Sequence, residues 1–118
     1  MKIARIRKNG IIIADQVSIA DSFFKRLIGL LKHQSLATSA GILLSPCKQV
    51  HTIGMNFSID VIFLSVDDQI VHIEYSMPPG KISKYVRSAA RVLEVQAGLV
   101  LIQELKLGDQ VHIEILRV

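Results

Sequence analysis

Several features that mark common protein classes are scarce in this 118-residue chain. Its one cysteine, Cys47, cannot form an internal disulfide, so we expect a reducing, cytoplasmic setting. Its few aromatic side chains are scattered, which argues against a base-stacking surface and against nucleic-acid binding. No apolar run approaches the roughly 20 residues that span a bilayer. The first residues are not followed by an apolar stretch, so we expect no secretory signal.

What the chain does have is enough apolar residues for one folded domain. Hydrophobic residues make up 50% of the sequence and the mean hydropathy is +0.41, which excludes a disordered, weakly hydrophobic chain. No proline- or serine-rich linker divides the sequence, so we expect a single domain over residues 1–118. The net charge of +4 is concentrated in residues 1–35. Such a mild bias attracts anions only weakly and does not identify a partner.

The order of the expected elements predicts an α+β fold. Strands outnumber helices and do not alternate regularly with them, which favours a partly closed barrel or a strongly curved, mostly antiparallel sheet. One main packed helix is expected over residues 22–32, where apolar residues recur along one stripe. Asn9-Gly10 predicts a two-residue hairpin turn. The expected strands are 2–7, 11–17, 41–45, 59–66, 69–76, 91–96 and 110–116, with a short helix over 99–106.

Two of these strands resemble each other. Residues 69–74 and 110–114 both read Gln, apolar residues, His, Ile and Glu, with His and Glu on one face. This pattern is typical of half-exposed strands with a polar outer face. If the strands were neighbours, their His and Glu side chains would provide metal ligands, but we predict no metal and no cofactor.

The most distinctive part of the sequence is the segment 46–60. It crowds polar residues between two apolar strands, where hydrophobic residues would have satisfied the periodicity. Cys47 and His51 are four residues apart and Thr52 follows directly. Asp60 begins a buried strand, and a carboxylate there needs hydrogen-bond partners because a buried unpaired charge is costly.

Three interpretations of this segment remain open. In the first, the polar groups satisfy loop backbone donors and Cys47 packs as a small apolar residue. In the second, the segment lines a pocket for a small polar or anionic ligand. In the third, Cys47 is a nucleophile activated by His51 and oriented by Asp60, which would make the protein a thiol-dependent hydrolase or transferase. The candidate ligand-binding residues are Cys47, His51, Thr52, Met55 and Asp60.

A longer pattern surrounds this segment and continues to the end of the chain. It comprises Gly29-Leu30-Leu31, Leu36, Gly41-Ile42-Leu43-Leu44, Pro46-Cys47, Val50-His51-Thr52, Gly54-Met55, Phe57, Ile59-Asp60-Val61, Phe63-Leu64, Pro79-Gly80, Val92-Leu93-Glu94, Ala97-Gly98 and Leu107-Gly108-Asp109-Gln110-Val111. This pattern resembles the domain-of-unknown-function 192 family. The resemblance implies a β-rich domain, often standing alone in bacteria and archaea, with no established reaction, substrate or cofactor. Ser58 and Ser65 depart from the family, which commonly has a proline and an acidic residue there.

A basic cluster follows two prolines and a glycine later in the chain. Its residues recur every three or four positions, which is typical of a solvated face but also of a rim that binds anions. The candidate rim residues are Lys81, Lys84, Arg87 and Arg91. Together these features favour a non-catalytic small-ligand-binding or accessory domain. The thiol-dependent enzyme is the alternative, and a protein partner stays open.

Overall fold

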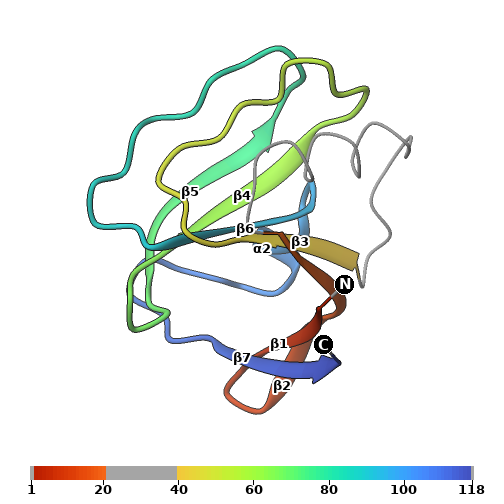
Figure 1. The fold of residues 1–118 in the computed structure, drawn as a ribbon, viewed down its shortest axis with the longest axis vertical. Helices are drawn as coiled ribbons and strands as arrows, with labels where there is room; N and C mark the ends of the chain where they lie inside the picture. Colours follow the sequence, from red (N-terminus) through yellow and green to blue (C-terminus); the bar gives the residue numbers. More distant parts are fainter. Residues whose placement is uncertain (1, 21–39, 118) are drawn as a thin grey trace.

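The computed structural model of the protein describes residues 2–20 and 40–117. These residues form strands and one short helix, which Figure 1 labels in chain order. The strands are β1 (Ile3–Lys8), β2 (Ile11–Ala20), β3 (Ala40–Leu44), β4 (Ile59–Leu64), β5 (Ile70–Met77), β6 (Arg91–Gln96) and β7 (His112–Arg117), and the helix is α2 (Leu99–Ile102).

All the described strands belong to one curved sheet. Its seven strands run in the order β5-β4-β6-β3-β2-β1-β7, and every pair except β2 and β3 is antiparallel. The expectation of a curved, mostly antiparallel sheet is confirmed. The α+β assignment needs correction, because the described chain is mostly β with little helix. The helix expected over residues 22–32 lies outside the described residues.

The sheet stays open, although its two edges meet at one end. The Ile70 amide donates to the Asp109 carbonyl at 2.9 Å, and the Val111 amide donates to the Asp68 carbonyl at 3.0 Å. These bonds join the start of β5 to the turn that precedes β7. Further along, the two strands diverge to opposite edges of the sheet (Figure 1).

Backbone angles confirm the predicted hairpin turn and show that the second predicted helix is too long. Asn9 and Gly10 have φ of 51° and 77°, and they connect β1 to β2, so the predicted hairpin turn is confirmed. The helix expected over 99–106 is shorter than predicted. It ends at Ile102, and Glu104 has a positive φ of 53°, which no α-helix accommodates.

The central strands are buried on both faces, which explains their nearly continuous apolar sequences. Residues of β3, β4 and β6 alternate between two apolar clusters. The inner cluster lies in the concavity of the sheet and contains Leu43, Ile62, Leu64, Leu93, Val95 and the α2 residues Leu99 and Val100. The outer cluster lies on the other face and contains Ile42, Leu44, Ile59, Val61, Phe63 and Val92, covered by Val50, Met55, Val86 and Ala89 from two long loops.

Candidate functional site

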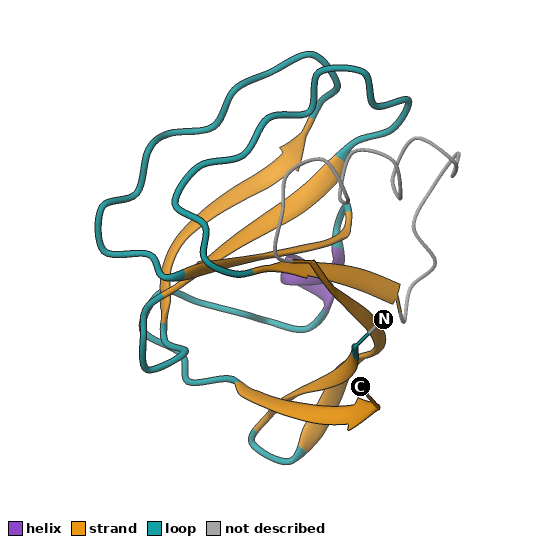
Figure 2. Cartoon of the chain, in the orientation of Figure 1, coloured by secondary structure: helices purple, strands orange, loops and turns teal. Residues whose placement is uncertain are grey.

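The 46–60 segment pairs with the loop formed by residues 78–90, which we call the 78–90 loop. Figure 2 shows the two loops running side by side along one end of the sheet. The Ser83 amide donates to the Val50 carbonyl at 2.8 Å, and the Val50 amide donates to Ser83 Oγ at 2.9 Å. Lys48 makes three hydrogen bonds to the 78–90 loop. Its carbonyl accepts from the Val86 amide at 2.8 Å, and its Nζ donates to the carbonyls of Arg87 at 2.9 Å and Ala89 at 2.5 Å. The polar groups of the segment therefore hold the second loop in place.

Among the residues that make these hydrogen bonds, Thr52 is fully buried. None of its surface is exposed. Its hydroxyl donates to the Pro78 carbonyl and accepts from the Lys81 amide at 3.0 Å, while its own amide donates to the Lys81 carbonyl at 2.8 Å. Its carbonyl accepts from the Gly80 amide at 3.0 Å. Each polar group of Thr52 thus fixes the beginning of the 78–90 loop.

Asp60 lies on the other face of the sheet from the loops. It pairs with Val95 of the inner cluster, whereas its neighbours Ile59 and Val61 belong to the outer cluster. Its carboxylate is 1% exposed and accepts three backbone hydrogen bonds. The donors are the amides of Ser76 at 2.8 Å and of Gly98 and Val100 at 3.0 Å each. Asp60 therefore joins β4, β5 and the start of α2, and the sheet separates it from the rest of the 46–60 segment.

The other candidate residues of the segment remain on the outer face. Met55 is buried in the outer cluster and Cys47 packs against it, partly buried. The Cys47 thiol donates to the Gln49 carbonyl at 3.2 Å. His51 Nδ1 accepts from the Ile53 amide at 3.2 Å, and the His51 backbone pairs with Ile82 of the 78–90 loop. The role of these residues toward a ligand stays a prediction.

A buried carboxylate on this outer face was not selected by reasoning from residue patterns. Glu94 is fully buried in β6, opposite Ile42 and Val61 of the outer cluster. In the sequence, Glu94 stands out only as part of the pattern shared with the family. One feature does mark it: Glu94 is a charged residue inside the apolar strand 92–95, and a charged side chain is almost never fully buried unless it is paired.

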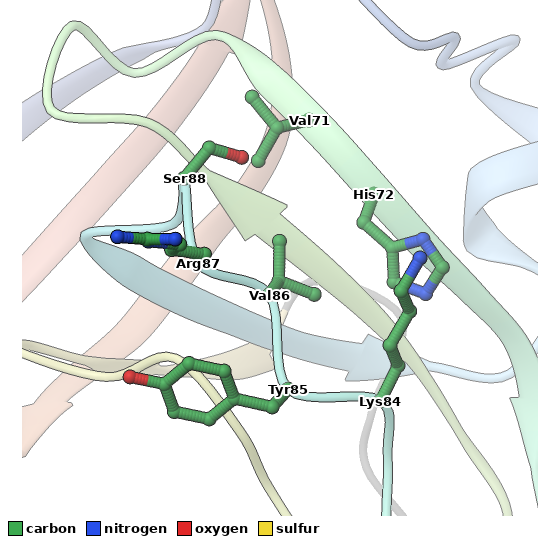
Figure 3. A pocket seen from close by; sticks show the side chains of 7 residues that line it. All are labelled: Val71, His72, Lys84, Tyr85, Val86, Arg87 and Ser88. Atoms are coloured by element: carbon green, nitrogen blue, oxygen red, sulfur yellow. The ribbon is translucent and has the colours of Figure 1, made fainter.

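An open groove lies between β5 and the 78–90 loop. It has a volume of about 470 Å³ and is lined by Val71, His72, Lys84, Tyr85, Val86, Arg87 and Ser88. Figure 3 shows Val86 at its centre, the Lys84 side chain extending toward His72, and Arg87 on the opposite side of Val86. The groove thus combines apolar walls with two permanent cations, which suits a small anionic ligand with an apolar part.

Only two of the four residues predicted to form an anion-binding rim line this groove. Lys84 and Arg87 line it, but Lys81 and Arg91 do not. Lys81 is held at the Thr52 end of the loop through its backbone. The Arg91 guanidinium instead pairs with Asp68 at 3.0 Å. Burial raises the pKa of Asp68 above its ordinary value of 3.8, although Arg91 beside it acts in the opposite direction.

His72 adds a third nitrogen-bearing side chain to the groove. Its Nε2 is 2.5 Å from Glu74 Oε2, and its ring lies 5.2 Å from that of Phe63, tilted by 59°. Both side chains of the His72–Glu74 pair are partly exposed. The similar His and Glu residues of the last strand, His112 and Glu114, lie on β7 at the opposite edge of the sheet. Within residues 2–20 and 40–117, no group of three or more potential metal ligands is found.

The fold and these loops define a class of protein: a mostly β domain built on one open, seven-stranded sheet whose outer face is covered by two paired loops. The chain belongs to the domain-of-unknown-function 192 family, described as an uncharacterised ACR, and the family model matches residues 4–113. No curated protein matches this chain. Among its described helices, none is long and apolar enough to cross a bilayer.

Two solved structures share this fold. One is a protein of unknown function from Novosphingobium aromaticivorans, with a TM-score of 0.79 and 18% identity over 93% of this chain and 83% of that one. The other is described as a putative transcription regulator from Sinorhizobium meliloti, with a TM-score of 0.77 and 22% identity over 95% of this chain and 92% of that one. At these identities the similarity establishes the fold alone.

Proposed function

We propose that this protein is a non-catalytic binding domain that takes a small anionic ligand in the groove between β5 and the 78–90 loop. The observation that carries the proposal is that Lys84, Arg87 and His72 line one groove together with apolar residues. Hydrogen bonds from charged donors to an anion are about twice as strong as neutral ones, so two permanent cations give such a ligand its main attraction.

The 46–60 segment has an indirect part in this proposal. Lys48 bonds to the backbone of Val86 and Arg87, which are groove residues, and Thr52 fixes the start of the same loop. A loop held in its binding geometry loses little conformational freedom when the ligand arrives, and this preserves affinity. The segment is therefore a positioning device for the groove.

The test is a titration with sodium sulfate, followed by calorimetry and by amide chemical shifts. We expect Lys84→Gln and Arg87→Gln each to weaken sulfate binding by about tenfold, which corresponds to about 1.4 kcal/mol. The matched control is Lys81→Gln, because Lys81 is exposed on the same loop but does not line the groove. Added sodium chloride should weaken binding to the native protein by screening.

Two outcomes would contradict the proposal. One is the absence of sulfate-dependent shifts at residues of the groove. The other is an equal loss of affinity in Lys81→Gln, which would indicate a diffuse attraction to surface charge instead of a site.

A further inference from the structure

We propose that anion binding in this groove is coupled to the protonation of His72, so that the ligand is taken up together with one proton. The inference rests on the proposed function and specifies how the same site is regulated. It follows from the hydrogen bond of His72 and from the charges that face its ring.

The first step concerns which nitrogen of His72 carries the proton. Glu74 Oε2 lies 2.5 Å from His72 Nε2, and an ionised carboxylate can only accept a hydrogen bond. Nε2 must therefore be the protonated nitrogen when the imidazole is neutral. The hydrogen bond at one ring nitrogen thus determines the state of the other.

The second step concerns Nδ1. Within the described part of the chain, this nitrogen makes no hydrogen bond. In the neutral ring it carries a lone pair, which repels an anion. In the imidazolium form it becomes an N–H donor. In that form the ring also carries a positive charge at the wall of the groove.

The third step is the charge balance around the ring. On β5 itself, Glu74 is the charged neighbour of His72. The 84–88 part of the loop contributes Lys84, Arg87 and the hydroxyl of Tyr85 to the same groove. From β4, the ring that faces His72 is that of Phe63, which is uncharged.

With a neutral imidazole, the His72–Glu74 pair carries one negative charge at the wall of the groove. With an imidazolium, the pair is neutral and leaves the charges of Lys84 and Arg87 unopposed. Protonation therefore shifts the local field in favour of an anion. By reciprocity, a bound anion stabilises the imidazolium by the same free energy.

The experiment measures sulfate affinity across about pH 5.5 to about pH 8.5, the range in which imidazoles titrate. Sulfate is chosen because it stays a dianion throughout this range, whereas phosphate would itself change charge. We expect the sulfate affinity of the native protein to fall as the pH rises, by at most about tenfold for each pH unit, and then to level off at the affinity that Lys84 and Arg87 supply beside a neutral imidazole. Calorimetry in two buffers with different heats of ionisation should record the uptake of about one proton for each sulfate.

The variants separate this mechanism from general charge effects. His72→Gln should leave binding that no longer changes with pH. Glu74→Gln keeps an acceptor for Nε2 but removes the negative charge, so the decline in affinity should move to lower pH. The matched control is His112→Gln, whose histidine is exposed on β7 and outside the groove, and it should retain the native profile.

The outcomes distinguish this inference from the function on which it rests. Sulfate binding that depends on Lys84 and Arg87 but is constant with pH would overturn the coupling and leave the anion site. A pH dependence that persists in His72→Gln would also overturn the coupling. The absence of sulfate binding at every pH would overturn the proposed function itself.

Discussion

At the scale of the residue, the buried polar groups of the 46–60 segment act mainly on backbone donors and acceptors. Asp60 accepts three amide hydrogen bonds, and Thr52 uses its hydroxyl, amide and carbonyl on the 78–90 loop. A buried backbone amide without a partner is costly, so one carboxylate with three such donors stabilises three parts of the chain at once.

The variant Asp60→Asn tests this role. It replaces one acceptor oxygen with an NH2 group that would face a backbone amide, and it removes the charge that strengthens the remaining bonds. We expect the free energy of unfolding to fall by about 3 kcal/mol. Urea denaturation followed by far-UV circular dichroism measures the change.

Asp67→Asn is the control for this variant, since Asp67 is exposed in the turn between β4 and β5. Its stability should lie within about 0.5 kcal/mol of the native value. An Asp60→Asn protein as stable as this control would show that the three amide bonds contribute little.

At the scale of the element, two long loops behave as a paired unit. Hydrogen bonds between them extend from Thr52 and Lys81 to Cys47 and Ala90, and Val50, Met55 and Val86 cover the outer cluster beneath them. Loops without such connections lie at the low end of local stability. Here the paired loops present the groove residues from a fixed support.

Thr52→Val and Thr52→Ser test whether the pairing positions the groove. Valine removes the hydroxyl while nearly keeping the shape, and leaves the Pro78 carbonyl and Lys81 amide without their shared partner. We expect Thr52→Val to lower the free energy of unfolding by about 2 kcal/mol. It should also weaken sulfate binding, although Thr52 does not line the groove.

Thr52→Ser restores the hydroxyl and should recover most of the sulfate affinity. Calorimetric titration of both variants below their unfolding midpoints provides the comparison. Equal affinity in Thr52→Val and the native protein would mean that the groove keeps its geometry without this connection.

At the scale of the whole molecule, the two apolar clusters share the same strands. Phe63 on β4 belongs to the outer cluster and Leu93 on β6 belongs to the inner one, and β4 and β6 pair along their full length. Loss of either cluster removes the packing on one face of the strands that hold the other. We therefore expect residues 1–118 to unfold as one domain.

Phe63→Ala and Leu93→Ala test this cooperativity from the two faces. We expect the free energy of unfolding to fall by about 4 kcal/mol in Phe63→Ala and by about 3 kcal/mol in Leu93→Ala. Each substitution leaves a cavity where a fully buried side chain had been. In both variants the denaturation curves from circular dichroism and from resolved methyl signals of each cluster should coincide. Separate transitions for the two clusters would indicate two independently folding units.

Features that depend on neighbouring residues follow from the sequence alone. Asn9-Gly10 fixed the hairpin turn because both residues tolerate positive φ, and short apolar runs bounded by turn residues located the central strands. The long pattern around the 46–60 segment identified the family. Successive side chains of a strand point to opposite faces, so Asp60 lies on the face opposite to Ile59 and Val61. The sequence does not indicate which face of β4 carries a functional site, because both faces are buried and apolar.

Only the tertiary structure decided which polar residues meet. The pairing of β4 with β6 places Asp60 on the inner face, away from Cys47. The path of the 78–90 loop places Lys84 and Arg87 in the groove with His72 and leaves Lys81 and Arg91 outside it. These contacts join residues far apart in the chain, and they depend on strand order and register instead of local preference. The physical reason is that a residue's conformation responds to its neighbours in sequence, whereas a binding groove is defined by neighbours in space.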